Sequence, residues 1–298
     1  MLQFRLLSSL GSQHTIRLPA AAALQSVQID GKAQPIRQEK GAITLPVHPG
    51  EQNVKITWRE TQDLPLHYRT SSVNLGTDSV NHKIQVNLGQ DRWVLFVSGP
   101  RLGPAVLFWG VLIVLALLAY GLGKVKTIPL KGWQWFLLAV GFSQAELMTA
   151  LVVVAWLFLL AWRQTLPKTT EDGPFNLAQI VIGVVTLFAL TALFHAVSQG
   201  LLGYPDMQVE GNMSDAYHLN WFSDYAPATL PTASILSVPL YIYRALMLLW
   251  SLWLAFTLLG LLRWAWQAFS ANGIWRKISL HKGGNKPKDA QSAPAKEE

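Results

Sequence analysis

The chain has 298 residues, of which 51% are hydrophobic and 14% are charged, and its formal net charge is +7 at pH 7. So few charges exclude a disordered protein, and a mean hydropathy of +0.26 is high for a soluble one. The absence of cysteine excludes disulfides, thiolate metal sites and cysteine nucleophiles.

The charges are unevenly distributed. Residues 1–101 carry 18 of the 41 Asp, Glu, Lys and Arg residues, and residues 263–298 carry seven of the 24 Lys and Arg. Basic residues that follow an apolar span usually set membrane orientation. We therefore assign the positive charge to membrane topology and expect no nucleic-acid partner.

Residues 1–100 are predicted to form an antiparallel β-sandwich. Apolar and polar residues alternate over 43–47, 53–60 and 83–88, which gives each strand one buried and one wet face. Turn dipeptides such as Asp30-Gly31 and Pro49-Gly50 separate the alternating runs. The expected fold class is thus mixed, with this sandwich followed by an α-helical transmembrane bundle at 101–266.

Long uncharged stretches predict the membrane spans. Residues 102–123 contain no charge, 173–205 form a second uncharged stretch, and 237–262 are interrupted only by Arg244. About 20 residues are needed for one helical crossing. The predicted spans are about 104–122, 175–200 and 237–262, with a further apolar segment at 132–162. The basic tail at 267–298 is expected to be disordered from about residue 279.

The segment 132–162 leaves two alternatives open. Its 31 residues are too few for two full crossings, which need about 40. It is either a re-entrant hairpin that breaks at Gly141–Gln144 or one crossing preceded by a helix in the membrane interface. The acidic segment 201–236 contains no Lys or Arg, which favours an outside location for it. The hairpin places the basic loops inside and the acidic segment 201–236 outside, so we expect the β-domain to lie outside the membrane and the tail inside.

Three ionisable residues lie in or beside the apolar spans: Glu146, His195 and Arg244. Charge inside a bilayer is costly, so each needs a partner, water or a route to the interface. They could form a polar cluster in which Glu146 pairs with Arg244. Alternatively, Arg244 extends to the lipid headgroups while Glu146 caps a helix.

The acidic and aromatic segment 201–236 offers a second candidate site at Asp215, His218 and Asp224. Their spacing fits no metal motif. The competing interpretation is that this segment packs over the bundle and against the β-domain, with Trp221, Phe222 and Tyr225 buried. The scattered histidines His14, His48, His67 and His82 lack the spacing of metal ligands. We therefore expect no catalytic residue, no metal site and no cofactor.

Two apolar segments, GPRLGPAVLFWGVLIVLALLAYGLG at 99–123 and PLKGWQWFLLAVGFSQ at 129–144, follow the predicted β-domain. In this order the chain resembles the C-terminal portion of large uncharacterised inner-membrane proteins of Gram-negative bacteria with extracytoplasmic β-domains. The resemblance implies a multi-pass inner-membrane location, a periplasmic β-domain and a place at the end of a longer polypeptide. It supplies no catalytic residues.

Three functions are compatible with this organisation. The first is an anchor or interaction subunit of the bacterial envelope, with the lipid bilayer and an envelope protein as its partners. The second is a transporter or channel subunit that uses Glu146, His195 and Arg244. The third is a membrane enzyme with its site in 201–236, although an enzyme is the less expected outcome.

Overall fold

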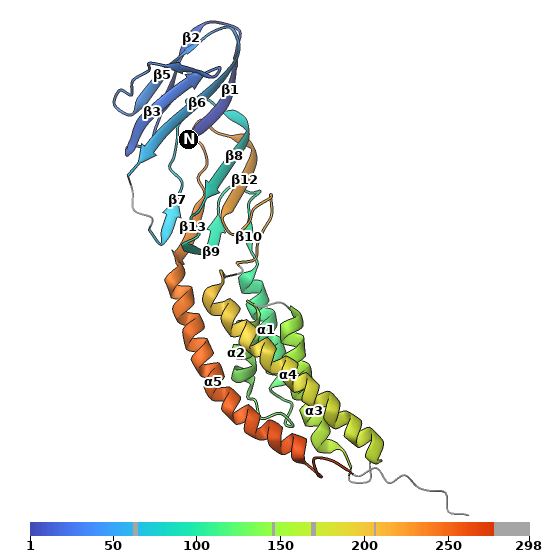
Figure 1. The fold of residues 1–298 in the computed structure, drawn as a ribbon. Coiled ribbons are helices and arrows are strands. Elements are labelled where there is room, and N and C mark those ends of the chain that lie inside the picture. Colours follow the sequence, from blue (N-terminus) through green and yellow to red (C-terminus); the bar gives the residue numbers. More distant parts are fainter. Residues whose placement is uncertain (62–64, 145–146, 168–170, 206, 277–298) are drawn as a thin grey trace, which may run out of the picture.

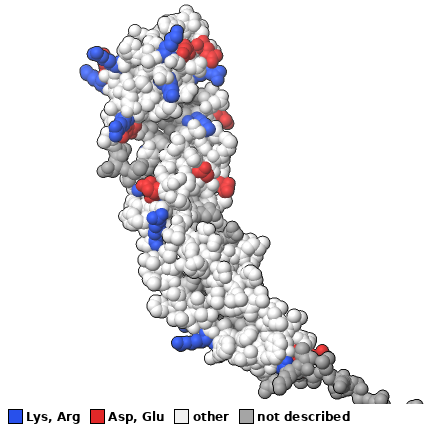
Figure 2. All heavy atoms as spheres, in the orientation of Figure 1, with Lys and Arg blue, Asp and Glu red and all other residues white. Residues whose placement is uncertain are grey.

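The computed structural model describes residues 1–61, 65–144, 147–167, 171–205 and 207–276. Figure 1 shows an elongated molecule with β-strands at one end and helices at the other. Figure 2 shows Lys, Arg, Asp and Glu gathered over the strands, whereas most of the helical surface lacks them. The predicted fold class, antiparallel β-sheets followed by a bundle of apolar helices, is confirmed.

The six strands farthest from the helices form what we call the distal module. A four-stranded antiparallel sheet has the order β1-β6-β3-β4, and β2 pairs with β5. Alternation in β6 places Val54 and Ile56 in the core and exposes Lys55, as the sequence predicts. The strands are β1 (Leu2–Ser8), β2 (Ser12–Arg17), β3 (Ala22–Ile29), β4 (Lys32–Gln34), β5 (Ala42–Val47) and β6 (Gly50–Glu60).

The β3–β4 hairpin illustrates the local turn chemistry. Asp30 and Gly31 both have positive φ, 50° and 77°, between the paired residues Ile29 and Lys32. A two-residue turn with two left-handed residues matches the twist of antiparallel strands, and Asp-Gly is a preferred sequence for it.

The remaining strands form the proximal module, next to the helices. In it, β8 pairs with β12, β13 lies between β7 and β9, and β10 pairs with β11. The strands are β7 (His67–Arg69), β8 (Ser79–Asn87), β9 (Arg92–Ser98), β10 (Ala105–Val106), β11 (Val209–Glu210), β12 (His218–Ala226) and β13 (Ser234–Pro239).

The proximal module therefore joins two parts of the chain that lie more than 100 residues apart. The segment 201–236, expected to pack as a connection, instead contributes β11, β12 and the first half of β13 to the sheets. Trp221 is buried as expected, at 1% exposure, whereas Tyr225 is 57% exposed. The expected boundary at residue 100 thus does not separate strands from helices.

The described residues form five helices: α1 (Phe108–Leu122), α2 (Gly132–Phe142), α3 (Leu147–Thr165), α4 (Asp172–Leu202) and α5 (Leu240–Ser270). Three of them, α3, α4 and α5, are long and apolar enough to cross a membrane, so the chain has the features of a membrane protein. The first span, expected over 104–122, has a shorter helix, because Ala105 and Val106 pair with β11. The 15 residues of α1 rise about 22 Å, less than the ~30 Å hydrocarbon core.

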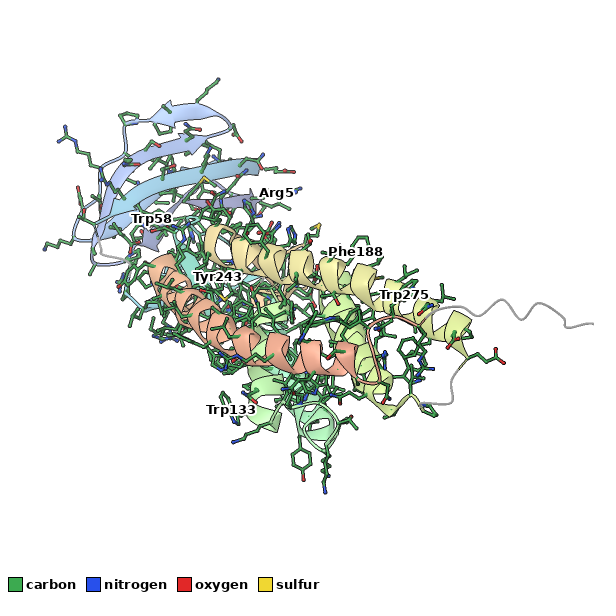
Figure 3. The ribbon with its side chains drawn as sticks, turned by 60° about the horizontal axis from the view of Figure 1, so that its bottom comes forward. Arg5, Trp58, Trp133, Phe188, Tyr243 and Trp275 are labelled. Atoms are coloured by element: carbon green, nitrogen blue, oxygen red, sulfur yellow. The ribbon has the colours of Figure 1, made fainter. Side chains whose placement is uncertain are left out.

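The helices pack through large side chains set against small ones. Trp156 of α3 is fully buried and donates its indole N–H to Thr186 Oγ1 of α4 at 2.9 Å. A Cβ on Gly141 would lie 2.0 Å from the indole of Trp250 in α5, so only glycine permits this approach. Figure 3 shows Phe188 pointing outward from α4, and its 64% exposure is typical of a lipid-facing residue.

The predicted break in 132–162 lies between α2 and α3. Because α3 and α4 are antiparallel neighbours and α4 leads back to β11, the start of α3 lies nearer the β-modules than its end. α1 leads away from these modules, so the chain must return through α2. The chain direction is thus that of a helical hairpin, and whether this hairpin re-enters a membrane stays a prediction. The predicted disorder of the tail lies outside the described residues.

Candidate functional site

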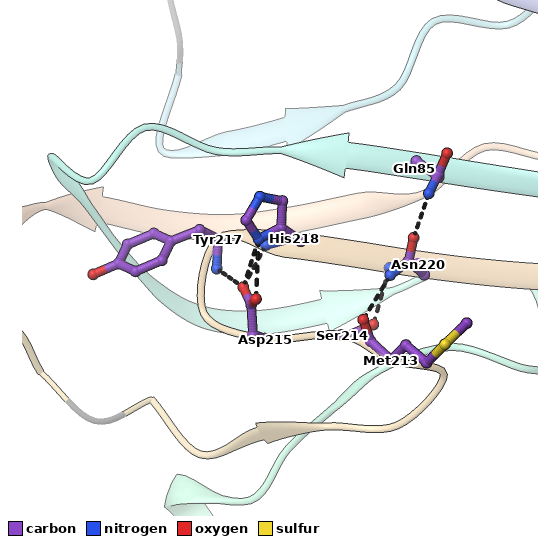
Figure 4. A network of polar contacts seen from close by, with 7 residues as sticks. All are labelled: Gln85, Met213, Ser214, Asp215, Tyr217, His218 and Asn220. Carbon is purple, nitrogen blue, oxygen red and sulfur yellow. Dashed lines mark hydrogen bonds and ion pairs between the residues drawn. The ribbon is translucent and has the colours of Figure 1, made fainter.

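Asp215 and His218 lie together in the turn before β12 (Figure 4). His218 Nδ1 is 3.0 Å from Asp215 Oδ2, and Asp215 Oδ1 accepts the backbone N–H groups of Tyr217 at 2.7 Å and His218 at 2.8 Å. This pattern is an Asx-type turn, in which a carboxylate fixes the backbone that follows it. Both side chains are 61% exposed, so the pair closes a surface turn.

Asp224, the third residue of this expected site, lies elsewhere. It is six residues farther along β12 than His218, which corresponds to about 20 Å of extended strand. Among the described residues, no group of three or more His, Cys, Asp or Glu side chains is arranged to hold a metal ion. Asp215, His218 and Asp224 therefore do not form one site.

The electrostatics of the turn also favour a structural role. The backbone N–H of Tyr217, followed by hydrogen bonds from His218, lowers the pKa of the Asp215 carboxyl group below its usual value. A carboxylate with a lowered pKa stays ionised at neutral pH and is a weak proton donor or acceptor there.

The structure also separates two members of the expected intramembrane cluster. Gly200 of α4 contacts Met247 of α5, which places Arg244 on the β-module side of this contact and His195 on the opposite side. Both side chains are exposed on the outside of the bundle, and among the described residues no hydrogen bond or ion pair joins them. Glu146 lies outside the described residues.

Arg163 forms a buried polar site that sequence reasoning missed. Its side chain is fully buried at the end of α3, and it donates to Gln179 Oε1 at 3.1 Å, to the carbonyl of Ala271 at 2.7 Å and to that of Gly273 at 3.2 Å. Its guanidinium carbon also lies 4.4 Å from the centre of the Phe175 ring. These contacts tie the segment after α5 to α3 and α4.

Another pair, Ser234 and His67, superficially resembles a nucleophile and its base. Ser234 Oγ lies 2.6 Å from His67 Nε2 across the β7–β13 pair, and His67 is exposed. Within the described part of the chain, no carboxylate contacts the other ring nitrogen of His67. A hydrolytic site needs such an orienting group and an oxyanion hole, so we interpret this pair as a cross-strand contact.

The two β-modules enclose a cleft of about 360 Å³ beside β8, which we call the β8 cleft. Residues 82–87 of β8 form one wall, and Trp58, Glu60, Tyr68 and Ser71 lie among the residues of the others. Glu60 Oε1 accepts the indole N–H of Trp58 at 2.6 Å, and Glu60 Oε2 accepts the hydroxyl of Ser71.

Burial keeps two titratable groups of the β8 cleft neutral. It raises the pKa of the Tyr68 hydroxyl, with a further contribution from the charge of Glu60, and it lowers the pKa of the His82 imidazole. His82 Nδ1 is buried and has no hydrogen-bond partner within the described structure. Among its described lining residues, the cleft thus offers several neutral hydrogen-bonding groups together with the charged groups of Glu60, Lys83 and the Met1 amino terminus.

Comparison of this chain with family models, curated proteins and solved structures finds no match. The resemblance to the C-terminal portion of large inner-membrane proteins therefore stays an expectation.

Proposed function

We propose that the chain is an interaction subunit anchored in the bacterial inner membrane, and that its β-modules bind a partner protein outside the cytoplasm. The observation that carries this proposal is the direct attachment of the proximal module to three helices, α1, α4 and α5. Such an attachment suits a protein that holds a binding surface at a fixed position above a bilayer.

The attachment is both covalent and packed. Pro239 ends β13 and Leu240 begins α5, while Val106 of β10 is two residues before α1. The indole of Trp93 in β9 makes edge contacts with Phe108 of α1, at 6.0 Å between ring centres, and with Tyr243 of α5, at 5.5 Å. One strand thus contacts the first turn of two helices, which resists bending between the module and the bundle.

Aromatic and charged residues support the proposed orientation. Trp93, Phe96, Phe108 and Trp109 gather where strands meet helices, as expected for an aromatic belt at a membrane interface. Arg163 and Arg276 lie at the opposite end of the bundle, where positive charge favours the cytoplasmic side. We therefore place the β-modules in the periplasm and the tail in the cytoplasm.

The two alternative functions receive less support. A transporter would need a polar path, yet His195 and Arg244 are exposed on the outer surface of the bundle and do not contact each other. An enzyme in 201–236 would need its candidate residues together, whereas Asp224 lies along β12, away from Asp215 and His218.

Photo-crosslinking in intact cells tests the proposal. A photoreactive amino acid at Leu7, which is 80% exposed on the distal module, should give a discrete protein adduct. The same group at Phe188, on the lipid-facing surface of α4, should give none and serves as the matched control. The anchor model would be contradicted if no exposed position of either β-module gave an adduct.

A further inference from the structure

One edge of β8 carries unpaired backbone groups. β8 pairs only with β12 within the described sheets, and the N–H of Leu88 donates to the carbonyl of Tyr217 at 2.8 Å, continuing the β8–β12 register. Backbone groups alternate in direction along a strand. Because the N–H of Leu88 points toward β12, those of Lys83, Gln85 and Asn87 point away from it.

The free edge of β8 lies along the β8 cleft. Lys83, Gln85 and Asn87 all line this cleft, and Glu60 and Tyr68 lie among the residues of its other walls. Figure 1 shows β12 beside β8, and no other described strand pairs with β8. An alternating row of N–H and C=O groups at strand spacing is complementary to one kind of ligand, another extended polypeptide.

Apart from Asn81 near its start, which has a positive φ of 56°, β8 lacks the features that usually protect an edge strand. Exposed edges are commonly short, bulged, proline-containing or charged. β8 is nine residues long and contains no proline, and its one charged residue, Lys83, places its ammonium 5.1 Å from the ring of Phe222 on β12. The cationic end of this side chain is thus held on the neighbouring strand.

We propose that the β8 cleft binds an extended segment of a partner protein as an added strand beside β8. The proposal rests on the proposed function and names the surface that performs it. Glu60 carries the negative charge of the cleft, Lys83 and the amino group of Met1 carry positive charge, and burial favours the neutral forms of Tyr68 and His82. A segment of low charge with hydroxyl or amide side chains therefore fits, with one donor directed at the Glu60 carboxylate.

A tethered strand tests this inference without knowledge of the partner. Met1 lines the cleft, so the sequence Thr-Val-Thr-Val-Thr-Gln-Thr can be fused before Met1 through a flexible Gly/Ser linker in the full chain. Tethering raises the effective concentration to about the millimolar range. Hydrogen exchange of the Lys83, Gln85 and Asn87 amides, followed by mass spectrometry in detergent, should slow by about tenfold, which corresponds to ~1.4 kcal/mol.

A matched fusion with proline at both valine positions removes backbone donors from the added strand and should give no slowing. Basic and acidic versions, with Lys or Glu in place of the central Thr residues, should protect less than the low-charge strand. The proposal is overturned if no fused strand slows exchange. It is also overturned if the unfused chain already shows protection that is lost on dilution, because a second copy would then occupy the edge.

The fusion experiment and the crosslinking experiment can fail separately. An adduct from Leu7 without strand protection at β8 would retain the interaction function and refute this surface. Strand protection at β8 without an adduct from any β-module position would contradict the proposed function and leave the edge as a site for added strands.

Discussion

Trp221 is the largest fully buried side chain of the proximal module, and two glycines make room for it. A Cβ on Gly103 would lie 2.3 Å from the indole ring, and one on Gly99 would lie 2.8 Å from it. We expect Trp221→Ala to lower the free energy of unfolding by about 3–5 kcal/mol, because burial is lost and a cavity remains. Denaturant unfolding of the solubilised chain measures this change.

The neighbouring Phe222 provides the control for Trp221. It points to the other face of β12, is only partly buried and contacts the Lys83 ammonium. Phe222→Ala should cost less than half as much as Trp221→Ala. Equal losses would show that the core of the proximal module is not centred on Trp221.

Asp215 gives a prediction about pH. The pKa of its carboxyl group is lowered in the folded chain from the ordinary value of 3.8, so its contribution to the turn is complete above 3.8 and is lost as the pH falls through the lowered value. At neutral pH the carboxylate is ionised and accepts the Tyr217 and His218 backbone N–H groups. Asp215→Ala removes these hydrogen bonds and should speed exchange of the two amides severalfold. Asp224→Ala should not change these rates, and if it did, the two carboxylates would share a site after all.

Whether the sequence could predict the contacts of a candidate residue depends on how far along the chain its partners lie. Asp215 and His218 are three residues apart, so a turn brings them together and the sequence could predict their proximity. Arg163 depends on Gln179, Ala271 and Gly273, the last two more than 100 residues away, so no spacing in the sequence indicated its role.

At the scale of elements, the site around Arg163 holds the end of α5. Arg163→Ala would leave the Ala271 and Gly273 carbonyls and the Gln179 side chain without this donor, at about 1–3 kcal/mol for each buried group left unsatisfied. We expect faster hydrogen exchange over residues 271–276. Arg163→Lys should rescue only part of this, because an ammonium lacks the planar fork of a guanidinium.

The exposed Arg263 of α5 is the control for Arg163. Arg263→Ala removes the same charge from the same end of the bundle and should leave exchange over 271–276 unchanged. A similar acceleration in both variants would assign the effect to net charge instead of to the buried hydrogen bonds.

The sequence predicts some of the strands and helices but not others. Alternation predicted the strands of residues 1–100, and the run of Gly, Ser and Gln predicted the break after Phe142, because both signals are local. Strands β12 and β13 were missed, since their partners β8 and β9 lie more than 130 residues earlier in the sequence. The short pairing of Ala105 and Val106 with β11 also shortened the first predicted span.

At the scale of the whole molecule, the order of the segments couples the β-modules to the bundle. The chain forms part of the proximal module, passes through four helices, returns to complete that module and leaves through α5. Ala226 and Leu230, from this return segment, also join the core of the distal module. The β-modules and the apolar helices are therefore linked in one fold, because the proximal module is completed only by strands that follow α4 in the chain.

The proposed path through the membrane has a direct test, since the chain contains no cysteine of its own. If 132–162 is a re-entrant hairpin, the end of α3 and the tail lie in the cytoplasm, and the turn before β12 lies outside. Met213→Cys, at a residue that is 83% exposed, should react with an impermeant thiol reagent in intact spheroplasts. Gln164→Cys, near the end of α3, should react only after permeabilisation.

Chain direction and charge together predict this labelling pattern. α3 and α4 are antiparallel neighbours, and α4 leads directly to β11, so residue 164 and residue 213 must lie at opposite ends of the bundle. Arg163 and Arg276 lie at one end, and the segment 207–243 at the other contains no Lys or Arg. Labelling of Gln164→Cys in intact spheroplasts would invert the chain and place both β-modules in the cytoplasm. Labelling of both variants from outside would mean that α4 does not cross the membrane, and the attachment of three helices to the proximal module would then need another explanation.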